Sequence, residues 1–226
     1  MSRPSYQDQL EALREDVLAM GDLVIRRLRL GLEALDRTDH ELAWRVIDGD
    51  DAVNDRYLAV EQDCIDLLAL QQPVASDLRL VAASFKIITD LERIADLAVN
   101  LGEYALYADG DTLADVDVTE LGERAISMVE GALTAYDERD GEACRAVAER
   151  DDDLDTHCER ASETVVRDLI ETELATDADE EAIELLMQDV SQVLLTIRDL
   201  ERVGDHAVNV AARTYYMVES DASLIE

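Results

Sequence analysis

One stretch of eleven residues occurs twice in this chain, and this repeat constrains the fold more than any other feature of the sequence. DLERIADLAVN at 90–100 and DLERVGDHAVN at 199–209 share eight of eleven residues at an offset of 109. A second match aligns 36–54 with 137–155 at an offset of 101, so the repeat extends over much of each half. The sequence therefore predicts two homologous units, at 1–110 and 111–226. The difference between the two offsets predicts an insertion in the second unit, near the loop between its second and third helices.

Each unit carries the periodicity of long helices. Apolar residues recur at helical spacing over 10–35, 42–70 and 78–106, and again over 121–136, 142–173 and 180–218. Only 4% of the residues are aromatic, and this composition favours helices over strands. The glycine-containing and acidic stretch 108–117 interrupts the periodicity and is predicted to be a linker. The predicted fold class is all-α, with two tandem three-helix bundles built from six long helices.

The chain is strongly acidic, with a net charge of −34. Self-repulsion of this size destabilises a compact state in dilute buffer, whereas molar salt shortens the screening length to about 3 Å. We therefore expect a protein adapted to molar salt, as in a halophile that accumulates salt. The sequence contains no basic patch that could release counterions from a phosphate backbone, which argues against direct binding of nucleic acid.

The sequence also indicates a compartment. No apolar run approaches the roughly 18 residues that a membrane span needs, and the first ten residues lack the hydrophobic region of a signal peptide. Cys64, Cys144 and Cys158 form no Cys-x-x-Cys pair and are odd in number, which favours reduced thiols over a disulfide framework. We expect a cytoplasmic protein.

The repeated segment places carboxylates four residues apart, on one face of a helix. The two columns are Glu92, Asp96 and Asn100 in the first half, and Glu201, Asp205 and Asn209 in the second. Carboxylates this close repel one another and suit an oxygen-preferring cation such as Mg²⁺, Mn²⁺ or iron. With 54 acidic residues, about a dozen such pairs arise by chance, so a single pair indicates only a solvated face. The recurrence of the pair at matched positions favours the ligand interpretation.

The preceding helix of each half offers a second column. Asp50 with Asn54, and Asp151 with Asp155, are again four apart and occupy equivalent positions in the repeat. If the second and third helices pack antiparallel, these columns meet those of the third helices and give four oxygen-bearing side chains per bundle. His206 could join the second site, although a surface histidine is the simpler interpretation.

Catalytic motifs are missing from the sequence. A ferritin-like di-iron enzyme needs Glu-x-x-His, and none of His40, His157 and His206 has a glutamate three residues before it. No nucleophile motif and no glycine-rich phosphate loop occur either. The sequence therefore favours a binding protein over an enzyme, and it leaves open a metal-dependent helical-bundle enzyme and a metal-free helical adaptor.

Four motifs together resemble the PhoU family, over nearly the whole chain. They are VIDGDDAVN at 46–54, QPVASDLR at 72–79, LERIAD at 91–96 and LERVGD at 200–205. The resemblance implies two three-helix bundles whose carboxylate motifs bind multinuclear clusters of iron, manganese, zinc or magnesium. Carried onto this chain, the ligands are Asp50, Asn54, Glu92, Asp96, Asp151, Asp155, Glu201 and Asp205, with Asn100, Asn209 and His206 as possible supporting residues. Asn54 departs from the motif, so the first cluster is expected to be the weaker or smaller one.

The resemblance also implies a function. Members of the family restrain high-affinity phosphate uptake and phosphate signalling through contacts with other proteins. The implied partners are the ATPase and membrane subunits of a phosphate ABC transporter and, in many bacteria, a sensor kinase. A homodimer is also implied.

Overall fold

The computed structural model describes residues 5–71, 75–107, 116–175 and 180–225. Over these ranges the chain forms eight α-helices and no strand, so the all-α class is confirmed. The helices are α1 Tyr6–Arg37, α2 His40–Ile47, α3 Asp51–Gln71, α4 Ala75–Tyr107, α5 Val118–Glu138, α6 Gly141–Glu149, α7 Asp151–Ala175 and α8 Glu180–Glu219.

The second long helix of each half is divided, where the periodicity predicted an unbroken helix over 42–70 and over 142–173. In the first half, the Val46 carbonyl accepts a hydrogen bond from the Arg27 side chain, and the Asp50 N–H turns to the Ile47 carbonyl at 3.3 Å. The helical ladder is thereby interrupted, and α3 starts anew at Asp51. In the second half, the Arg150 N–H donates to the Val147 carbonyl at 3.1 Å, and α7 starts at Asp151. The correction is that a short helix precedes each long one.

The turns between the first two helices are the same in both halves. Thr38 and Arg139 adopt the left-handed conformation, with φ of 49° and 56°. Asp39 and Asp140 follow them, and each carboxylate accepts hydrogen bonds from two backbone N–H groups of the next helix, as N-cap residues do. Both pairs obey the offset of 101, so the structure confirms the repeat.

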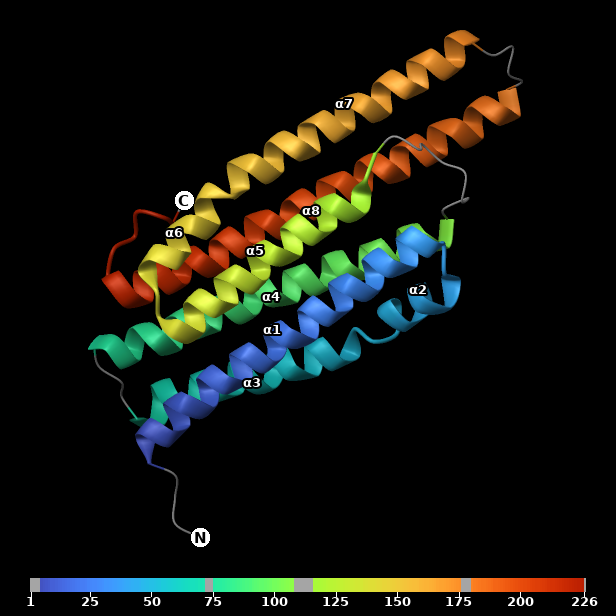
Figure 1. Cartoon of the computed structure of the whole chain (residues 1–226). Coiled ribbons are helices and arrows are strands. Elements are labelled where there is room, and N and C mark those ends of the chain that lie inside the picture. The colour runs from blue at the N-terminus through green and yellow to red at the C-terminus, as the bar shows by residue number, and fades with distance from the viewer. Residues whose placement is uncertain (1–4, 72–74, 108–115, 176–179, 226) are drawn as a thin grey trace.

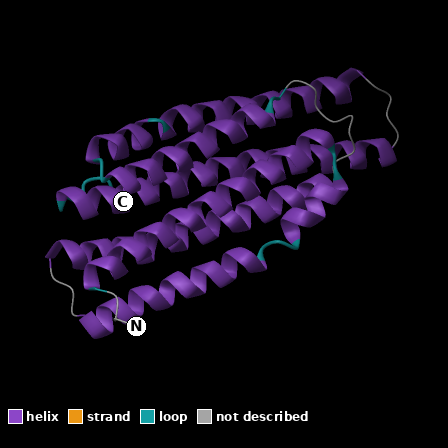
Figure 2. Ribbon diagram, turned by 60° about the horizontal axis from the view of Figure 1, so that its bottom comes forward, coloured by secondary structure: helices purple, strands orange, loops and turns teal. Residues whose placement is uncertain are grey.

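The two halves lie side by side and share one core. Figure 1 shows α1, α4, α5 and α8 as the central helices, with α3 flanking the first half and α7 flanking the second. Figure 2 shows the long helices running along a common direction. Buried apolar side chains from both halves form one continuous hydrophobic cluster. The predicted units are therefore two bundles in sequence but one packed body in space.

Reciprocal contacts between α1 and α5 show how the halves are related. A Cβ on Gly21 would collide with the Leu133 side chain, and a Cβ on Gly122 would collide with Leu32. The offset of 101 relates Gly21 to Gly122 and Leu32 to Leu133. Because residue i contacts j while the equivalent of j contacts the equivalent of i, the halves pack about an approximate twofold axis.

The extra residues of the second half lengthen the α7–α8 hairpin. At the offset of 101, the end of α3 at Gln71 corresponds to Thr172, but α7 continues to Ala175. At the offset of 109, the start of α4 at Ala75 corresponds to Glu184, but α8 begins at Glu180. The insertion therefore lies where the sequence predicted it.

Three further expectations concern the cysteines, membrane-spanning helices and the linker. All three cysteines are buried and free, as the sequence predicted. None of the described helices is long and apolar enough to cross a membrane. The linker was predicted at 108–117, and most of that stretch lies outside the described residues.

Candidate metal centres

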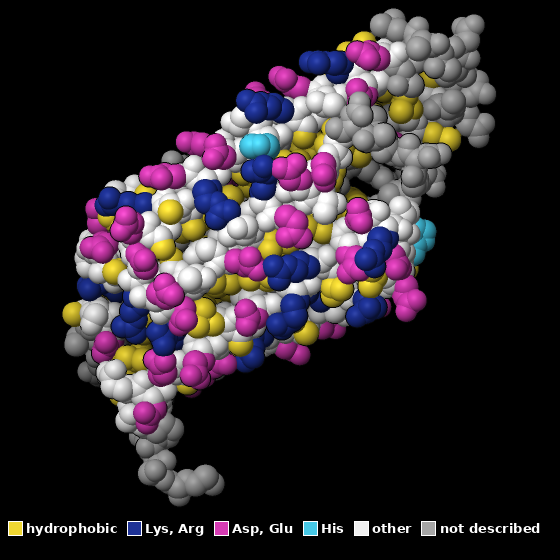
Figure 3. All heavy atoms as spheres, viewed as in Figure 1, with side chains coloured by type: hydrophobic (Ala, Val, Ile, Leu, Met, Phe, Trp, Pro, Cys, Tyr) yellow, Lys and Arg dark blue, Asp and Glu magenta, His cyan; other side chains and the backbone are white. Residues whose placement is uncertain are grey.

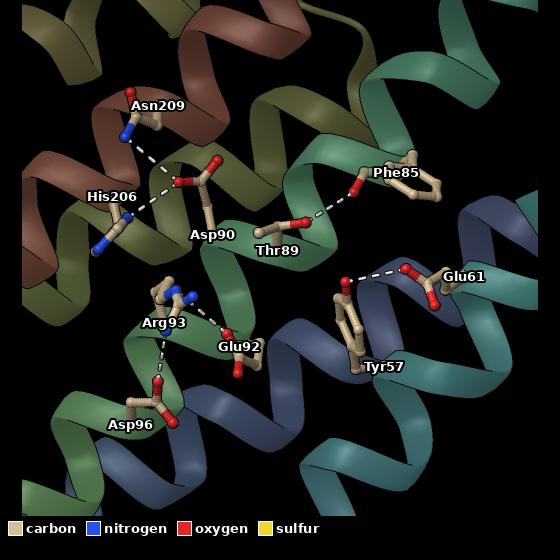
Figure 4. Close-up of polar contacts among 10 residues, drawn as sticks. All are labelled: Tyr57, Glu61, Phe85, Thr89, Asp90, Glu92, Arg93, Asp96, His206 and Asn209. Carbon is tan, nitrogen blue, oxygen red and sulfur yellow. Dashed lines mark hydrogen bonds and ion pairs between the residues drawn. The ribbon is translucent and has the colours of Figure 1, made fainter.

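The first cluster joins the start of α3 to the middle of α4. Asn54 Nδ2 donates to Asp50 Oδ2 at 2.8 Å, and Asp50 and Asp96 line the same hollow of about 360 Å³. Arg93 lies between Glu92 and Asp96, at 3.5 and 3.3 Å (Figure 4). Burial raises the pKa of Glu92, and the charge of Asp96 raises it further, while Arg93 opposes both. The structure therefore brings the four residues predicted for this half into one neighbourhood, together with an arginine.

The second cluster joins the start of α7 to the middle of α8. Burial raises the pKa of Asp151 to about 6, and the neighbouring charges of Asp155 and Asp205 add to this effect. Burial also raises the pKa of Glu201, again with a contribution from Asp155 and Asp205. The four residues predicted for this half thus lie close enough together to repel one another. Asp151 Oδ1 is buried and has no hydrogen-bond partner.

Gly204 permits the close approach of α7 to α8 at this cluster. A Cβ at this position would lie 2.5 Å from Leu154 Cδ2 and 3.2 Å from Asp151 Oδ1. The first half has Ala95 at the equivalent position. In the second half, the absence of a side chain at Gly204 leaves room for Leu154 and the Asp151 carboxylate.

The residues of the second cluster fit a hard cation. Four carboxylates supply only oxygen donors, which Mg²⁺ and Mn²⁺ prefer, and the orphaned Asp151 Oδ1 lacks the partner that a buried oxygen normally has. Within the described ranges, however, no three His, Cys, Asp or Glu side chains already stand in a metal-binding arrangement. Binding would therefore require side-chain rotation, and the metal clusters stay a prediction.

The three residues expected to support the metals have other partners, in the contact between α4 and α8. Asn100 Nδ2 donates to Asp199 at 2.8 Å, and Asn209 Nδ2 donates to Asp90 at 3.3 Å. His206 Nδ1 also lies 3.0 Å from Asp90, as Figure 4 shows. Each asparagine thus binds an acid of the opposite half, and we call this set the seam.

Asp199 is the buried member of the seam, with a side chain that is 0% exposed. Besides Asn100, it accepts a hydrogen bond from the Tyr104 hydroxyl at 2.8 Å and pairs with Arg198 at 2.8 Å. Burial and the bond to Asp199 raise the pKa of Tyr104 to about 12. Asp90 and Asp199 open the repeated DLER segment, but sequence reasoning assigned them no role. One signal in the sequence could have identified them: both repeats have an aspartate at this position, ten residues before an asparagine.

The surface agrees with the composition. On the face seen in Figure 3, acidic side chains are spread widely, with basic side chains scattered among them. This face shows no continuous basic area of the kind that binds a nucleic-acid backbone.

Comparison with known proteins gives the family. The family model described as the PhoU domain matches residues 17–105 and, a second time, residues 118–214. The chain belongs to the PhoU family. The two matched segments correspond to the two bundles, so the duplication read from the sequence is a tandem pair of PhoU domains.

Characterised PhoU relatives resemble the chain over almost its full length. The phosphate-specific transport system accessory protein PhoU homolog of Clostridium acetobutylicum is 32% identical, over 96% of this chain and 96% of its own length. The accessory protein PhoU of Escherichia coli K12 is 32% identical, over 95% of this chain and 85% of its own. The crystal structure of PhoU from Pseudomonas aeruginosa superposes with a TM-score of 0.84 at 30% identity, and covers 96% of this chain and 100% of that one. These relatives are named as accessory proteins of transport, which agrees with a non-enzymatic interpretation.

Proposed function

We propose that this PhoU-family chain is a regulator of phosphate homeostasis that restrains a phosphate-specific transport system when phosphate is plentiful. The observation that carries the proposal is the double PhoU match, together with relatives named as accessory proteins of that transport system. The shared core and the seam make the two bundles one body, which suits a protein that acts by contact. Its partners would be the transporter's ATPase and membrane subunits on the cytoplasmic side, and a sensor kinase where one exists. A homodimer, implied by the family resemblance, forms part of the same proposal.

The proposal includes a divalent metal at the second cluster. Four mutually repelling carboxylates and an unpartnered buried oxygen support it, because a bound cation would relieve the repulsion and give Asp151 a partner. Asp151, Asp155, Glu201 and Asp205 would hold the ion. The ion would supply positive charge between α7 and α8 and thereby fix the hairpin relative to the rest of the bundle.

Gene deletion tests the regulatory role. Cells that lack the protein should take up phosphate at a derepressed rate in phosphate-rich medium, and the wild-type gene should restore restraint. Complementation with Asp151→Asn/Glu201→Gln then asks whether regulation needs the metal. Unchanged uptake in the deletion strain would contradict the regulatory role, whatever the protein binds.

A metal-free helical adaptor is the second candidate. The absence of a preformed metal-binding arrangement in the described residues favours it, as does the use of both asparagines in the seam. Metal analysis of the purified protein separates the two. If Mn²⁺ binding is absent and the deletion phenotype is present, the adaptor is correct and the metal part of the proposal is wrong.

A further inference from the structure

A buried arginine lies at the first cluster and has no counterpart at the second. Arg27 of α1 is only 5% exposed, and its guanidinium donates to the Val46 carbonyl. It packs against Gly49 so closely that any side chain at that position would collide with it. The charge of Arg27 is thus placed at the turn that leads directly into Asp50.

The guanidinium and the Asp50 carboxylate act on each other. Arg27 lies against Gly49, the residue that precedes Asp50. Burial lowers the pKa of Arg27, and the negative charge of Asp50 opposes that shift. Arg27 Nε has no hydrogen-bond partner. Arg27 and Asp50 form no direct ion pair, so Asp50 is a nearby negative charge that acts on the buried guanidinium at longer range.

The repeat shows what the second half has instead. The offset of 101 relates Arg27 to Met128 and Asp50 to Asp151. Met128 is 1% exposed, and its Cε lies 3.6 Å from the point that a Cβ on Gly204 would occupy, while Asp151 Oδ1 lies 3.2 Å from that point. An apolar thioether therefore stands beside the carboxylate that has no partner.

The two clusters consequently differ in charge. In the first, Arg27 and the ion-paired Arg93 accompany three carboxylates, and Asn54 is neutral. In the second, none of the four carboxylates takes part in an ion pair among the described residues; they are Asp151, Asp155, Glu201 and Asp205. Arg202, the equivalent of Arg93, is instead within 3.9 Å of Asp199 in the seam.

We propose that Arg27 is the internal counterion of the first cluster and takes the place that a bound metal ion would occupy there. The second cluster then fills with a divalent cation at concentrations that leave the first empty. This inference rests on the proposed metal site of the second bundle. A divalent ion entering the first cluster would meet a fixed, buried positive charge that cannot move into solvent, and it would find one carboxylate fewer to hold it.

Equilibrium dialysis of the full chain against Mn²⁺ in buffered molar KCl tests the ranking. Two matched double variants are compared with the wild type: Asp50→Asn/Glu92→Gln in the first half and Asp151→Asn/Glu201→Gln in the second. The second-half pair should remove the tightest Mn²⁺ binding, and the first-half pair should leave it unchanged. If the first-half double variant loses as much tight Mn²⁺ binding as the second-half double variant does, Arg27 does not lower the affinity of the first cluster, and the inference is overturned.

Removing the charge of Arg27 gives the complementary test. Arg27→Gln keeps a donor for the Val46 carbonyl and should raise the affinity of the first cluster for Mn²⁺ about tenfold or more. Arg27→Lys, which keeps the charge, should not. The gain should vanish when Asp50→Asn/Glu92→Gln is added. A folded Arg27→Gln protein without the gain would overturn the inference, and if the variant does not fold, the two double variants still decide.

The outcomes also separate this inference from the proposed function. Mn²⁺ binding in the first cluster of the wild type, at the affinity of the second, overturns only the role of Arg27. No binding in either half overturns both the metal site and this inference. In both cases the regulatory role is judged independently, by phosphate uptake in the deletion strain.

Discussion

The two carboxylate clusters occupy equivalent places in two homologous bundles, yet their surroundings have opposite character. The first is charge-compensated, with a buried guanidinium and an amide where the second has a thioether and another carboxylate. In the second cluster, α7 lies close to α8 at a glycine, where the first cluster has an alanine. The positions that carry this difference are Arg27 and Met128, Asn54 and Asp155, and Ala95 and Gly204.

This difference shows that the same sequence motif can have different electrostatic properties in two homologous bundles. The Glu-x-x-x-Asp pairs of α4 and α8 are identical in sequence, but the side chains that decide their electrostatics come from other helices. Burial raises the pKa of Asp151 to about 6, with repulsion from its neighbours adding to it, whereas Asp50 accepts a hydrogen bond from Asn54. The environment of a carboxylate decides whether it needs a cation.

The largest expected effect contrasts the two acids of the seam. Asp199→Ala would leave Asn100, Tyr104 and Arg198 without their buried acceptor and should lower the free energy of unfolding by about 3 kcal/mol. Asp90, whose side chain is 16% exposed, has fewer partners, so Asp90→Ala should cost about 1 kcal/mol. Urea unfolding of both variants measures the difference. Equal losses of unfolding free energy in the two variants would show that Asp90 and Asp199 contribute equally to stability.

A smaller effect is expected at the glycine that compresses the second cluster. Gly204→Ala would force Leu154 and Asp151 to shift and should cost about 2 kcal/mol. The matched change in the first half, Ala95→Gly, loosens the helix and removes a buried methyl group, and should cost about 1.5 kcal/mol. Thermal unfolding of the two single variants provides the comparison, and a stabilising Gly204→Ala would show that α7 can move away without strain.

The carboxylate repulsion predicts a pH dependence. Because the pKa of Asp151 is about 6 in the folded protein and about 4 when unfolded, the native state binds the extra proton between these values, and stability without metal falls as pH rises through this range. After discounting for solvent screening, Asp151→Asn should stabilise the protein by about 1 kcal/mol at pH 7.

Two controls accompany this prediction. The gain from Asp151→Asn should disappear below about pH 4, where the wild-type carboxyl is protonated in both states. Asp50→Asn should destabilise the protein at pH 7, because it leaves Arg27 without its anionic neighbour. Chemical denaturation from about pH 3 to about pH 8 records both. A stabilising Asp50→Asn would remove the contrast between the clusters.

The smallest expected effect is that of salt on the stability difference between the two clusters. Raising KCl from about 0.1 M to molar concentration shortens the screening length from about 10 Å to about 3 Å, so the gain from Asp151→Asn should shrink by a few tenths of a kcal/mol. The wild type, with its net charge of −34, should meanwhile become more stable. Stability that does not rise with salt would contradict the predicted adaptation to molar salt.

Much of the fold could be read from the sequence because its determinants are local or periodic. The apolar spacing gave the long helices, and the paired offsets gave the duplication and the site of the insertion. The division of the second helix could not be read in this way. In the first half a hydrogen bond from Arg27 to the Val46 carbonyl accompanies the break, and these residues lie on different helices. The second half is divided as well, although Met128 stands in place of Arg27.

The sequence predicted which carboxylates would meet in each half and, from Asn54, that the first cluster would be the weaker one, but it did not indicate the other differences between the clusters. Antiparallel packing of equivalent helices was enough to bring Asp50 near Glu92 and Asp151 near Glu201. Asn100 and Asn209 were predicted to support the metals, but they donate to acids of the opposite half, and nothing local to α4 or α8 indicates those partners. The role of Arg27 is visible only when its equivalent, Met128, is compared in three dimensions.

The reciprocal contacts of Gly21 with Leu133 and of Gly122 with Leu32 make the surface of each half self-complementary, as in an isologous dimer. A homodimer of identical halves must carry the same side chains at both of its sites, because one gene segment encodes both. Joining the halves in a single chain removes that requirement while keeping the interface. This chain can therefore hold a charge-compensated cluster and a repelling cluster in one approximately symmetric frame.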